Sequence, residues 1–190
     1  MSKKIVERTD ERYCWIIKTT KGGPGEQGEG DYWDKFLHDN VVAVGWAGID
    51  ENPTDYSYDD FLNELRANYP WEKDNVAHTA STIYSFANCW QSGDIAIVCE
   101  GYTAMQDNKD VLVHGIATVG DFSCDPRPKW EWRFKRKAKI VPLNVRISKK
   151  VFVEAFGCRS MRLTIHGPFT LKQFEKFKKG IQKKRPDFQI

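Results

Sequence analysis

The histidines of this chain show no spacing typical of a catalytic or metal site. They are isolated from one another, at positions His38, His78, His114 and His166. A histidine acts as a base or a ligand only with partners nearby, and the common phosphate-loop, zinc-protease, serine-hydrolase and dinucleotide motifs are absent from the sequence. We therefore expect no metal, no cofactor and no catalysis. The alternative is a nucleic-acid-processing enzyme, such as a small nuclease, that uses Asp94 or Asp121 with a metal or an activated water.

Aromatic residues beside predicted turns are the stronger chemical signal. An aromatic face can hold an unstacked base, and each such stack contributes roughly 1–3 kcal/mol. The competing interpretation is that these residues belong to the core, since aromatic side chains dominate protein cores whatever the function. The tryptophans concerned are Trp15, Trp33, Trp46, Trp90, Trp130 and Trp132.

The charge of the chain is unevenly divided. Residues 127–190 contain 19 Lys and Arg against four Asp and Glu, which gives +15, whereas residues 1–126 carry −12. A basic region of this kind suits the phosphates of a nucleic acid. The two parts could instead neutralise each other within one molecule or drive self-association. The predicted phosphate-binding residues are Arg127, Lys129, Arg133, Lys135, Arg159 and Arg162.

Neither a membrane segment nor a disulfide framework is expected. No apolar run approaches the roughly 20 residues of a membrane span, and the residues after Met1 are charged rather than apolar. Five cysteines without a Cys-x-x-Cys pair indicate reduced thiols. We expect a cytoplasmic protein without a membrane partner.

The hydrophobic pattern predicts strands and helices without regular βαβ spacing. This predicts one α+β domain over residues 1–190, with a curved or barrel-like mixed sheet. Strands are expected at 13–19, 41–46, 95–99, 111–119 and 130–141, the last with Arg133 and Lys135 on a solvated basic face. Helices are expected at 31–37, 57–65, 79–90 and from 170 onward, with less regular structure at 143–169.

Several segments occur in the order and spacing of a known family. They are Trp15-Ile-Ile, Tyr32-Trp33-Asp-Lys-Phe36, Val42-Ala-Val-Gly45-Trp46, the stretch from Phe86 to Gly93-Asp94-Ile-Ala-Ile, His114-Gly115-Ile-Ala-Thr-Val119 and Trp130-Glu-Trp132. The series resembles EVE-like domains of the PUA superfamily, which also includes YTH and ASCH domains. The resemblance covers residues 13–142, and residues 143–190 form a basic C-terminal extension with a helix.

This resemblance implies a PUA/EVE-like curved mixed β-barrel flanked by helices. It also implies an aromatic pocket that binds a modified base, flipped from a duplex or single-stranded. EVE-like domains occur in bacterial and archaeal modification-dependent restriction systems of the McrB kind. The expected partners are thus DNA or RNA carrying a modified base, and a protein that supplies nuclease or motor activity. For the enzyme alternative, the superfamily suggests an ASCH-like hydrolase.

Pocket residues follow from position within the resemblance. Trp46 matches the aromatic that forms one wall of the pocket in YTH-like members. Related domains carry a second cage tryptophan in the loop that here spans 120–129 and lacks one, so Phe122 or Trp130 takes its place. Trp132 is assigned to the framework. The remaining candidates are Tyr32 and Trp33, which follow the overhanging loop, and Asp31 and Asn88, which could contact the edge of the base.

The charge division predicts binding that depends on salt. If the six basic residues named above each contact one phosphate, raising salt from about 50 to 200 mM should lower the affinity for a single strand roughly 300-fold. Titration of a fluorescent oligonucleotide at the two salt concentrations measures this. Binding that is indifferent to salt would contradict an electrostatic contact.

Overall fold

The strands of the described residues form one six-stranded sheet. The computed structural model describes residues 11–19, 32–46, 48–70, 75–101, 110–125, 133–161 and 164–189. The strands are β1 (Tyr13–Lys18), β2 (Val41–Val44), β3 (Ile95–Cys99), β4 (Asp110–Cys124), β5 (Phe134–Ser148) and β6 (Ile165–Thr170). Their order is β2-β5-β4-β3-β1-β6, in which β1 and β3 are parallel and the other neighbours antiparallel.

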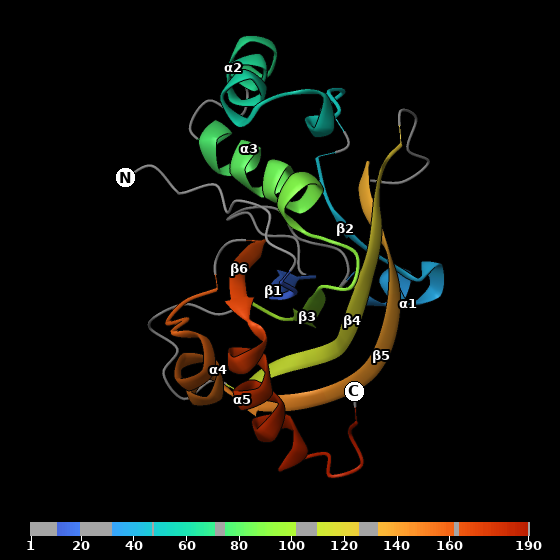
Figure 1. Cartoon of the computed structure of the whole chain (residues 1–190), viewed down its shortest axis with the longest axis vertical. Coiled ribbons are helices and arrows are strands. Elements are labelled where there is room, and N and C mark those ends of the chain that lie inside the picture. Colours follow the sequence, from blue (N-terminus) through green and yellow to red (C-terminus); the bar gives the residue numbers. More distant parts are fainter. Residues whose placement is uncertain are drawn as a thin grey trace.

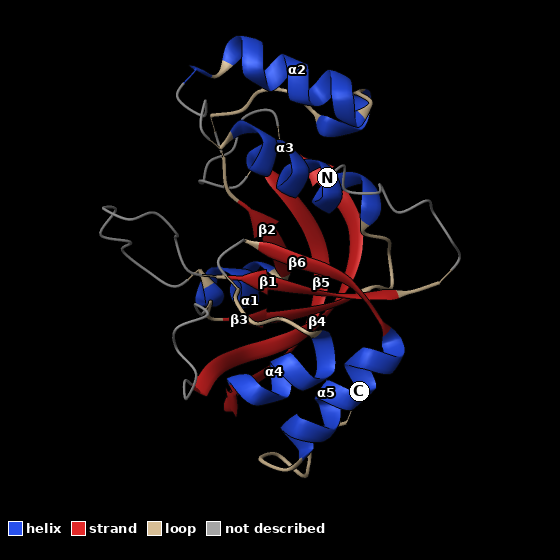
Figure 2. Ribbon diagram, turned by 90° about the vertical axis from the view of Figure 1, so that its left-hand side faces the viewer, coloured by secondary structure: helices blue, strands red, loops and turns tan. Residues whose placement is uncertain are grey.

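The helices gather at the two ends of this sheet. At one end lie α2 (Tyr58–Asn68) and α3 (Val76–Tyr84), and at the other lie α4 (Lys149–Phe156) and α5 (Leu171–Gln182) (Figures 1 and 2). The short α1 (Trp33–Asp39) precedes β2, and the 3-10 turn η1 (Pro53–Asp55) precedes α2. The long β4 and β5 curve between the two helical ends (Figure 1).

Buried strands divide the core between two faces of the sheet. Successive side chains of a strand point to opposite faces, so Trp15 and Ile17 join the cluster that includes α2 and α3, whereas Ile16 joins the cluster that includes α4 and α5. Strand β3 alternates in the same way. This explains why both strands are continuous apolar runs, because a sheet covered on both faces needs no polar side.

The α+β class and the mixed, curved sheet are confirmed, but a closed barrel is not. Among the described residues, the edge strands β2 and β6 do not pair with each other. None of the five cysteines forms a disulfide. No helix in the described ranges is both long and apolar enough to cross a membrane.

Helix starts follow their sequence signals. Ser57 caps α2, where its hydroxyl accepts from the Asp60 amide at 3.2 Å. Thr170 and Gln173 form a complete capping box at the start of α5, which satisfies amides that have no partner within the helix. Both predicted starts are confirmed.

Two predictions about residues 130–169 need correction. The predicted irregular stretch contains the end of β5, the helix α4 and β6. The predicted solvated face of the 130–141 strand is also wrong at Arg133, which is 5% exposed. Its guanidinium donates to the carbonyls of Asp125 and Asp50, which takes it into the protein. Residues 130–132 lie outside the described ranges.

Asp94 ties three parts of the fold together. Its fully buried carboxylate accepts from the Tyr13 amide at 2.8 Å, the Trp15 indole at 2.8 Å and the Gln91 amide at 3.1 Å. Its carbonyl accepts from the Val119 amide of β4. Since a buried carboxylate needs such donors, Asp94 holds β1 and β4 against the turn before β3.

This network predicts that Asp94→Ala is strongly destabilising. Three buried donors lose their acceptor, and we expect a loss of roughly 3–5 kcal/mol in the free energy of unfolding. Urea denaturation of the variant measures it. Asp121→Ala is the control, because this exposed carboxylate accepts only from the Ser92 hydroxyl among the described contacts, and it should cost less than about 1 kcal/mol. Equal losses would contradict the assignment of Asp94 as a structural anchor.

Candidate functional site

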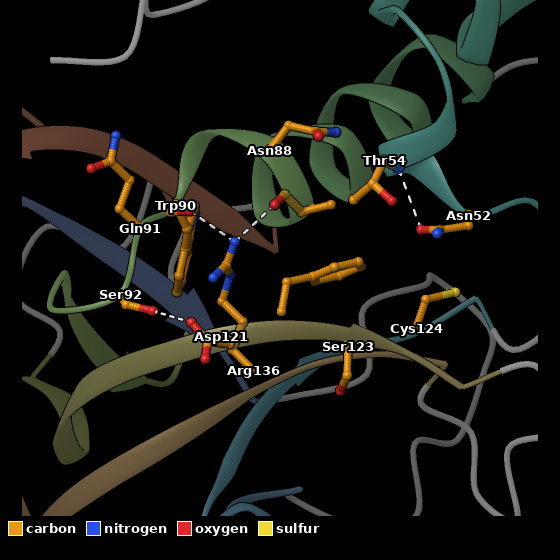
Figure 3. Close-up of a pocket in the computed structure, with 12 residues that line it drawn as sticks. Asn52, Thr54, Asn88, Trp90, Gln91, Ser92, Asp121, Ser123, Cys124 and Arg136 are labelled. Atoms are coloured by element: carbon orange, nitrogen blue, oxygen red, sulfur yellow. Dashed lines mark hydrogen bonds between the residues drawn. The ribbon is translucent and has the colours of Figure 1, made fainter.

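An open cleft of about 860 Å³ lies between the turn that follows α3 and the last part of β4 (Figure 3). This volume falls within the 300–1,000 Å³ typical of ligand pockets. Amides, hydroxyls and aromatic carbon all contribute to the lining. The lining residues are Asn52, Thr54, Ala87, Asn88, Trp90, Gln91, Ser92, Asp121, Phe122, Ser123, Cys124 and Arg136.

One wall of the cleft is a π-helical turn. Helix α3 continues into η3 (Ser85–Cys89), where the amide of Trp90 donates to the carbonyl of Ser85 at 3.2 Å. Such turns expose carbonyls that a regular helix would use and are frequent at functional sites. Here they face Arg136, whose guanidinium donates to the carbonyls of Phe86, Ala87 and Trp90, each at 2.8 Å.

The opposite wall contains a β-bulge. Val119 pairs with Ala138 and Phe122 pairs with Arg136, so β4 has one extra residue between these two pairs. The bulge leaves the Gly120 carbonyl to accept from Arg136 Nη1 at 2.9 Å. Bulges redirect side chains beside functional sites, and Asp121 lies in this one. Its carboxylate accepts from the Ser92 hydroxyl at 2.6 Å (Figure 3).

Arg136 therefore connects both irregular walls. It is 3% exposed and donates four hydrogen bonds to backbone carbonyls, three in the turn after α3 and one in β4. Its planar, delocalised cation also lies 5.6 Å from the ring centre of Phe122 and 5.7 Å from that of Phe86, within the range of cation–π attraction. Phe122 is thus positioned by Arg136 while part of its surface lines the cleft.

Trp90 completes the aromatic lining. Its ring stacks on Trp15 at 5.2 Å between centroids, and it meets Phe86 edge to face at 5.0 Å. The indole Nε1 is buried and has no hydrogen-bond partner in the part of the chain that the structure describes. A buried donor without a partner is rare in folded proteins. This unpaired donor, the π-helical turn and the β-bulge are all features that lower folding stability, and they occur together beside the cleft.

The two asparagine side chains of the cleft differ in how many of their hydrogen-bonding atoms have a partner. Asn52 caps η1, where it accepts from the Thr54 amide and donates to Asp55. Asn88 donates from Nδ2 to the carbonyl of Pro53 at 3.1 Å. This bond fixes the Asn88 side chain and leaves its Oδ1 without a donor among the described residues. Asn88 can thus present an acceptor to a ligand.

Nucleophilic and metal chemistry find little support in this geometry. Burial raises the pKa of the Cys124 thiol, although Arg133 acts in the opposite direction. A thiol with a raised pKa stays protonated near neutral pH and is a poor nucleophile. No group of three or more potential metal-ligating side chains occurs within the described residues. Of the two carboxylates considered for catalysis, Asp121 lines the cleft and Asp94 is buried away from solvent.

The predicted base-binding residues lie in different parts of the fold. Phe122 and Asn88 both line the cleft. Trp33 is buried and stacks on His114 at 5.4 Å, and a Cβ at Gly115 would lie 2.5 Å from the Trp33 ring, so this ring is packed in the core. Tyr32 is partly buried at the start of α1, where Lys35 lies over its ring. Asp31 and Trp130, together with the framework assignment of Trp132, lie outside the described residues.

Trp46 stands apart from the lining but shares its end of the sheet. Val44 of β2 pairs with Phe134 of β5, which pairs with Cys124 of the cleft. Trp46 lies two residues after Val44 and has a φ of 66°. A bulky residue in this left-handed region is a conformational outlier, and such outliers concentrate at functional sites.

The predicted phosphate contacts are dispersed. Lys135 is partly exposed, 3.6 Å from Asp125, and pairs in register with Ser123 of the cleft. Arg159 is exposed beyond the end of α4, near the other end of the sheet. Arg133 is buried, as described above, so we leave it out of any surface contact. Arg127, Lys129 and Arg162 lie outside the described residues.

Arg136 is the site residue that sequence reasoning missed. The alternation places it between Phe134 and Ala138, on the apolar face of β5. A charged residue in a position of the buried face indicates either a strand boundary or a satisfied interior cation. That single break in the pattern was the available signal.

We compared the chain with protein families, with curated proteins and with solved structures. A domain of unknown function, DUF8426, matches residues 21–112. This span includes the cleft residues from Asn52 to Ser92 and ends before those from Asp121 onward. No curated protein matches the chain. Among solved structures, a hypothetical protein from Leishmania major is similar over 94% of this chain and 99% of that chain, with 12% sequence identity and a TM-score of 0.48.

The site geometry predicts that Arg136 is required for both walls. In Arg136→Ala, four buried carbonyls lose their donor and a cavity opens, so the free energy of unfolding should fall by roughly 3–5 kcal/mol. Arg136→Lys should recover little, since one ammonium cannot reproduce the planar fork.

Chemical denaturation tests this prediction, with Lys137→Ala as the control. Lys137 is adjacent on β5 but exposed, and its loss should change stability by less than about 0.5 kcal/mol. An Arg136→Lys variant as stable as the parent would show that the forked hydrogen bonds are dispensable.

Proposed function

We propose that this chain is a nucleic-acid-binding module that takes an unstacked base into the cleft and performs no catalysis itself. The observation that carries the proposal is the lining, which combines the aromatic ring of Phe122 with amides and hydroxyls in a space of about 860 Å³. Bases need both, because they stack through their faces and are read by hydrogen bonds at their edges. The cleft is also large enough for a base and its sugar to enter together.

The proposed base is a modified one, carried on DNA or RNA. A methyl group buried against apolar carbon gains about 0.8 kcal/mol, and Phe122, Ala87 and Cys124 supply such carbon in the cleft. Acceptors for the edge of the base are Asn88 Oδ1 and the exposed carboxylate of Asp121. Flipping a base from a duplex costs a few kcal/mol, which stacking and edge hydrogen bonds can offset.

The basic residues of β5 lie on its outward face. Lys135 pairs in register with Ser123, and Lys137 and Lys139 follow as exposed residues on the same side of the strand. Since side chains alternate along a strand, this face is opposite the one from which Arg136 lines the cleft. The lysine-rich α5 lies at the other end of the sheet (Figures 1 and 2). Phosphate contacts are therefore proposed on the outward face of β5, for a backbone that passes round this end of the sheet.

The EVE-like resemblance adds context to this proposal. It supports a PUA/EVE-like architecture and a partner that supplies nuclease or motor activity in a restriction system. The role of Trp46 as a wall rests on this resemblance, because Trp46 is outside the cleft lining and packs against the core cluster beside α2 and α3. Its left-handed backbone, with a φ of 66°, is the structural feature that keeps it a candidate.

Binding of modified oligonucleotides by Phe122→Ala, Asn88→Ala and Trp46→Ala tests the proposal. Loss of one stacking wall should weaken binding by about 5- to 150-fold, which corresponds to roughly 1–3 kcal/mol. The probes are single strands of DNA and RNA carrying methylated cytosine, hydroxymethylated cytosine or methylated adenine, each beside its unmodified counterpart.

Leu37→Ala is the matched control, because this side chain is 36% exposed on α1 and lies outside the cleft. Its binding should equal that of the parent, and the melting temperature of every variant should be measured in parallel. If Trp46→Ala unfolds the protein, Trp46 is a core residue. If folded Phe122→Ala and Asn88→Ala bind every probe as the parent does, the cleft is not the base-binding site.

A further inference from the structure

A second hollow, of about 320 Å³, lies at the opposite end of the sheet from the cleft. It is formed where the end of β5 meets α4 and α5, and we refer to it as the lysine pocket. Four of its nine lining residues are lysines. The full lining is Ile147, Ser148, Val151, Glu154, Lys176, Lys179, Gly180, Lys183 and Lys184.

Close packing of the two helices shapes the floor of this pocket. A Cβ at Gly180 would lie 2.5 Å from Cγ1 of Val151, so glycine lets α5 approach α4. Phe152 and Phe177 pack behind this contact at 4.7 Å between ring centroids. The floor is thus apolar and rigid, made by Ile147, Val151 and Gly180.

Most of the positive charge on the rim of the lysine pocket has no ion-pair partner among the described residues. Lys176 donates to the carbonyl of Glu154 at 2.6 Å. The ammonium groups of Lys179, Lys183 and Lys184 have neither an ion pair nor a hydrogen bond to any described residue. The one carboxylate of the lining, Glu154, lies 3.8 Å from Lys150 outside the pocket. Like charges at helical spacing repel each other, and this repulsion opposes the favourable position of Lys179 and Lys183 at the C-terminal end of α5.

The first turn of α4 adds to the positive potential. Ser148 lines the pocket and caps this eight-residue helix, where its hydroxyl accepts from the Lys150 amide at 3.3 Å. The amides at a helix start carry partial positive charge. Helix start and lysines thus favour the same kind of ligand, an anion.

We propose that the lysine pocket binds a compact phosphate group with two or more negative charges, such as a pyrophosphate or a terminal phosphomonoester. A phosphodiester carries one charge and continues on both sides, which suits an open basic face. Several ammonium groups around one small hollow instead match charge concentrated in one ligand. The apolar floor accepts the carbon skeleton attached to it.

Two sources share this chemistry, a free nucleotide and the phosphorylated end of a nucleic-acid strand. The lysine pocket is separate from the base cleft, since Arg136 and Ile147 are eleven residues apart on β5 and a strand rises about 3.3 Å per residue, a span of up to roughly 36 Å. The proposal therefore does not depend on the proposed base-binding function.

Thermal denaturation with sodium pyrophosphate, at constant ionic strength adjusted with sodium chloride, tests the proposal on the full chain. Saturating pyrophosphate should raise the melting temperature of the parent by about 5 °C. The double variant Lys179→Ala/Lys183→Ala should lose this rise. The control Lys137→Ala/Lys139→Ala removes the same charge from exposed positions on β5 and should keep it, as should Phe122→Ala in the cleft.

Two further arms distinguish the sources of the phosphate. Binding of a nucleoside triphosphate without metal, and of one oligonucleotide with either a 5′-phosphate or a 5′-hydroxyl end, is measured on the same proteins. We expect the preferred source to bind at least about tenfold more tightly to the parent than to the lysine-pocket variant. Preference for the triphosphate identifies a free nucleotide, and preference for the 5′-phosphate identifies a strand end.

The proposal is overturned by either of two results. One is a rise in melting temperature that is equal in the lysine-pocket variant and the parent. The other is the absence of any rise at constant ionic strength. Without ligand, the lysine-pocket variant should melt within a few degrees of the parent, because Lys179 and Lys183 are exposed and the relief of like-charge repulsion is opposed by the loss of cations at the C-terminal end of α5. Its melting temperature without ligand shows that it is folded, so that its failure to respond reports the loss of binding.

Discussion

A guanidinium group inside the protein holds the candidate cleft open. An interior cation is costly unless its donors are satisfied, and Arg136 satisfies them with carbonyls from a π-helical turn and a β-bulge. Neither irregularity could place its carbonyls in the interior without this donor. The interaction is therefore mutual, since the carbonyls of both walls solvate the cation and the cation fixes the two walls relative to each other. Phe122 and Asn88 lie where they do because of this arrangement.

Both faces of the curved sheet are covered, and each face leads to a different hollow at a different end of the molecule. One core packs under α2 and α3 beside the polar cleft, and the other packs under α4 and α5 beside the lysine pocket. The strong charge division of the sequence is thus partly a spatial division.

Much of the fold could be predicted from local pattern. The strands at 95–99 and 13–18 are continuous apolar runs, and the helix starts at Ser57 and Thr170 carry their caps within three residues. The stretch 143–169 could not be assigned, because β5 continues through Pro142 and Asn144 and its pairing with β4 is set by residues some 30 positions away. Whether the sheet closes is likewise decided by tertiary contacts that leave no periodic signal.

The candidate site was less predictable than the fold. Phe122 was predicted from the family resemblance, in place of a cage tryptophan that is missing here, and Asn88 as a contact for the edge of a base; both line the cleft. Arg133 and Arg136, in contrast, resemble surface cations in the sequence. Only the pairing of β4 with β5, and the turn after α3, show that both side chains point inward. Trp33 shows the opposite case. It is an aromatic residue beside a predicted turn, but its ring packs in the core against His114 and Gly115.

The position of β1 in the sheet has a consequence for the order in which the chain can fold. The first strand lies between β3 and β6, so one of its edges is completed only by residues 165–170. During synthesis from the N-terminus, a strand of almost entirely buried residues must wait with an open edge until residues 165–170 have been made. Such distant pairing slows folding, since the long loop between the two strands must be closed before their contacts can stabilise either strand. The nascent protein therefore depends on β6 to protect β1.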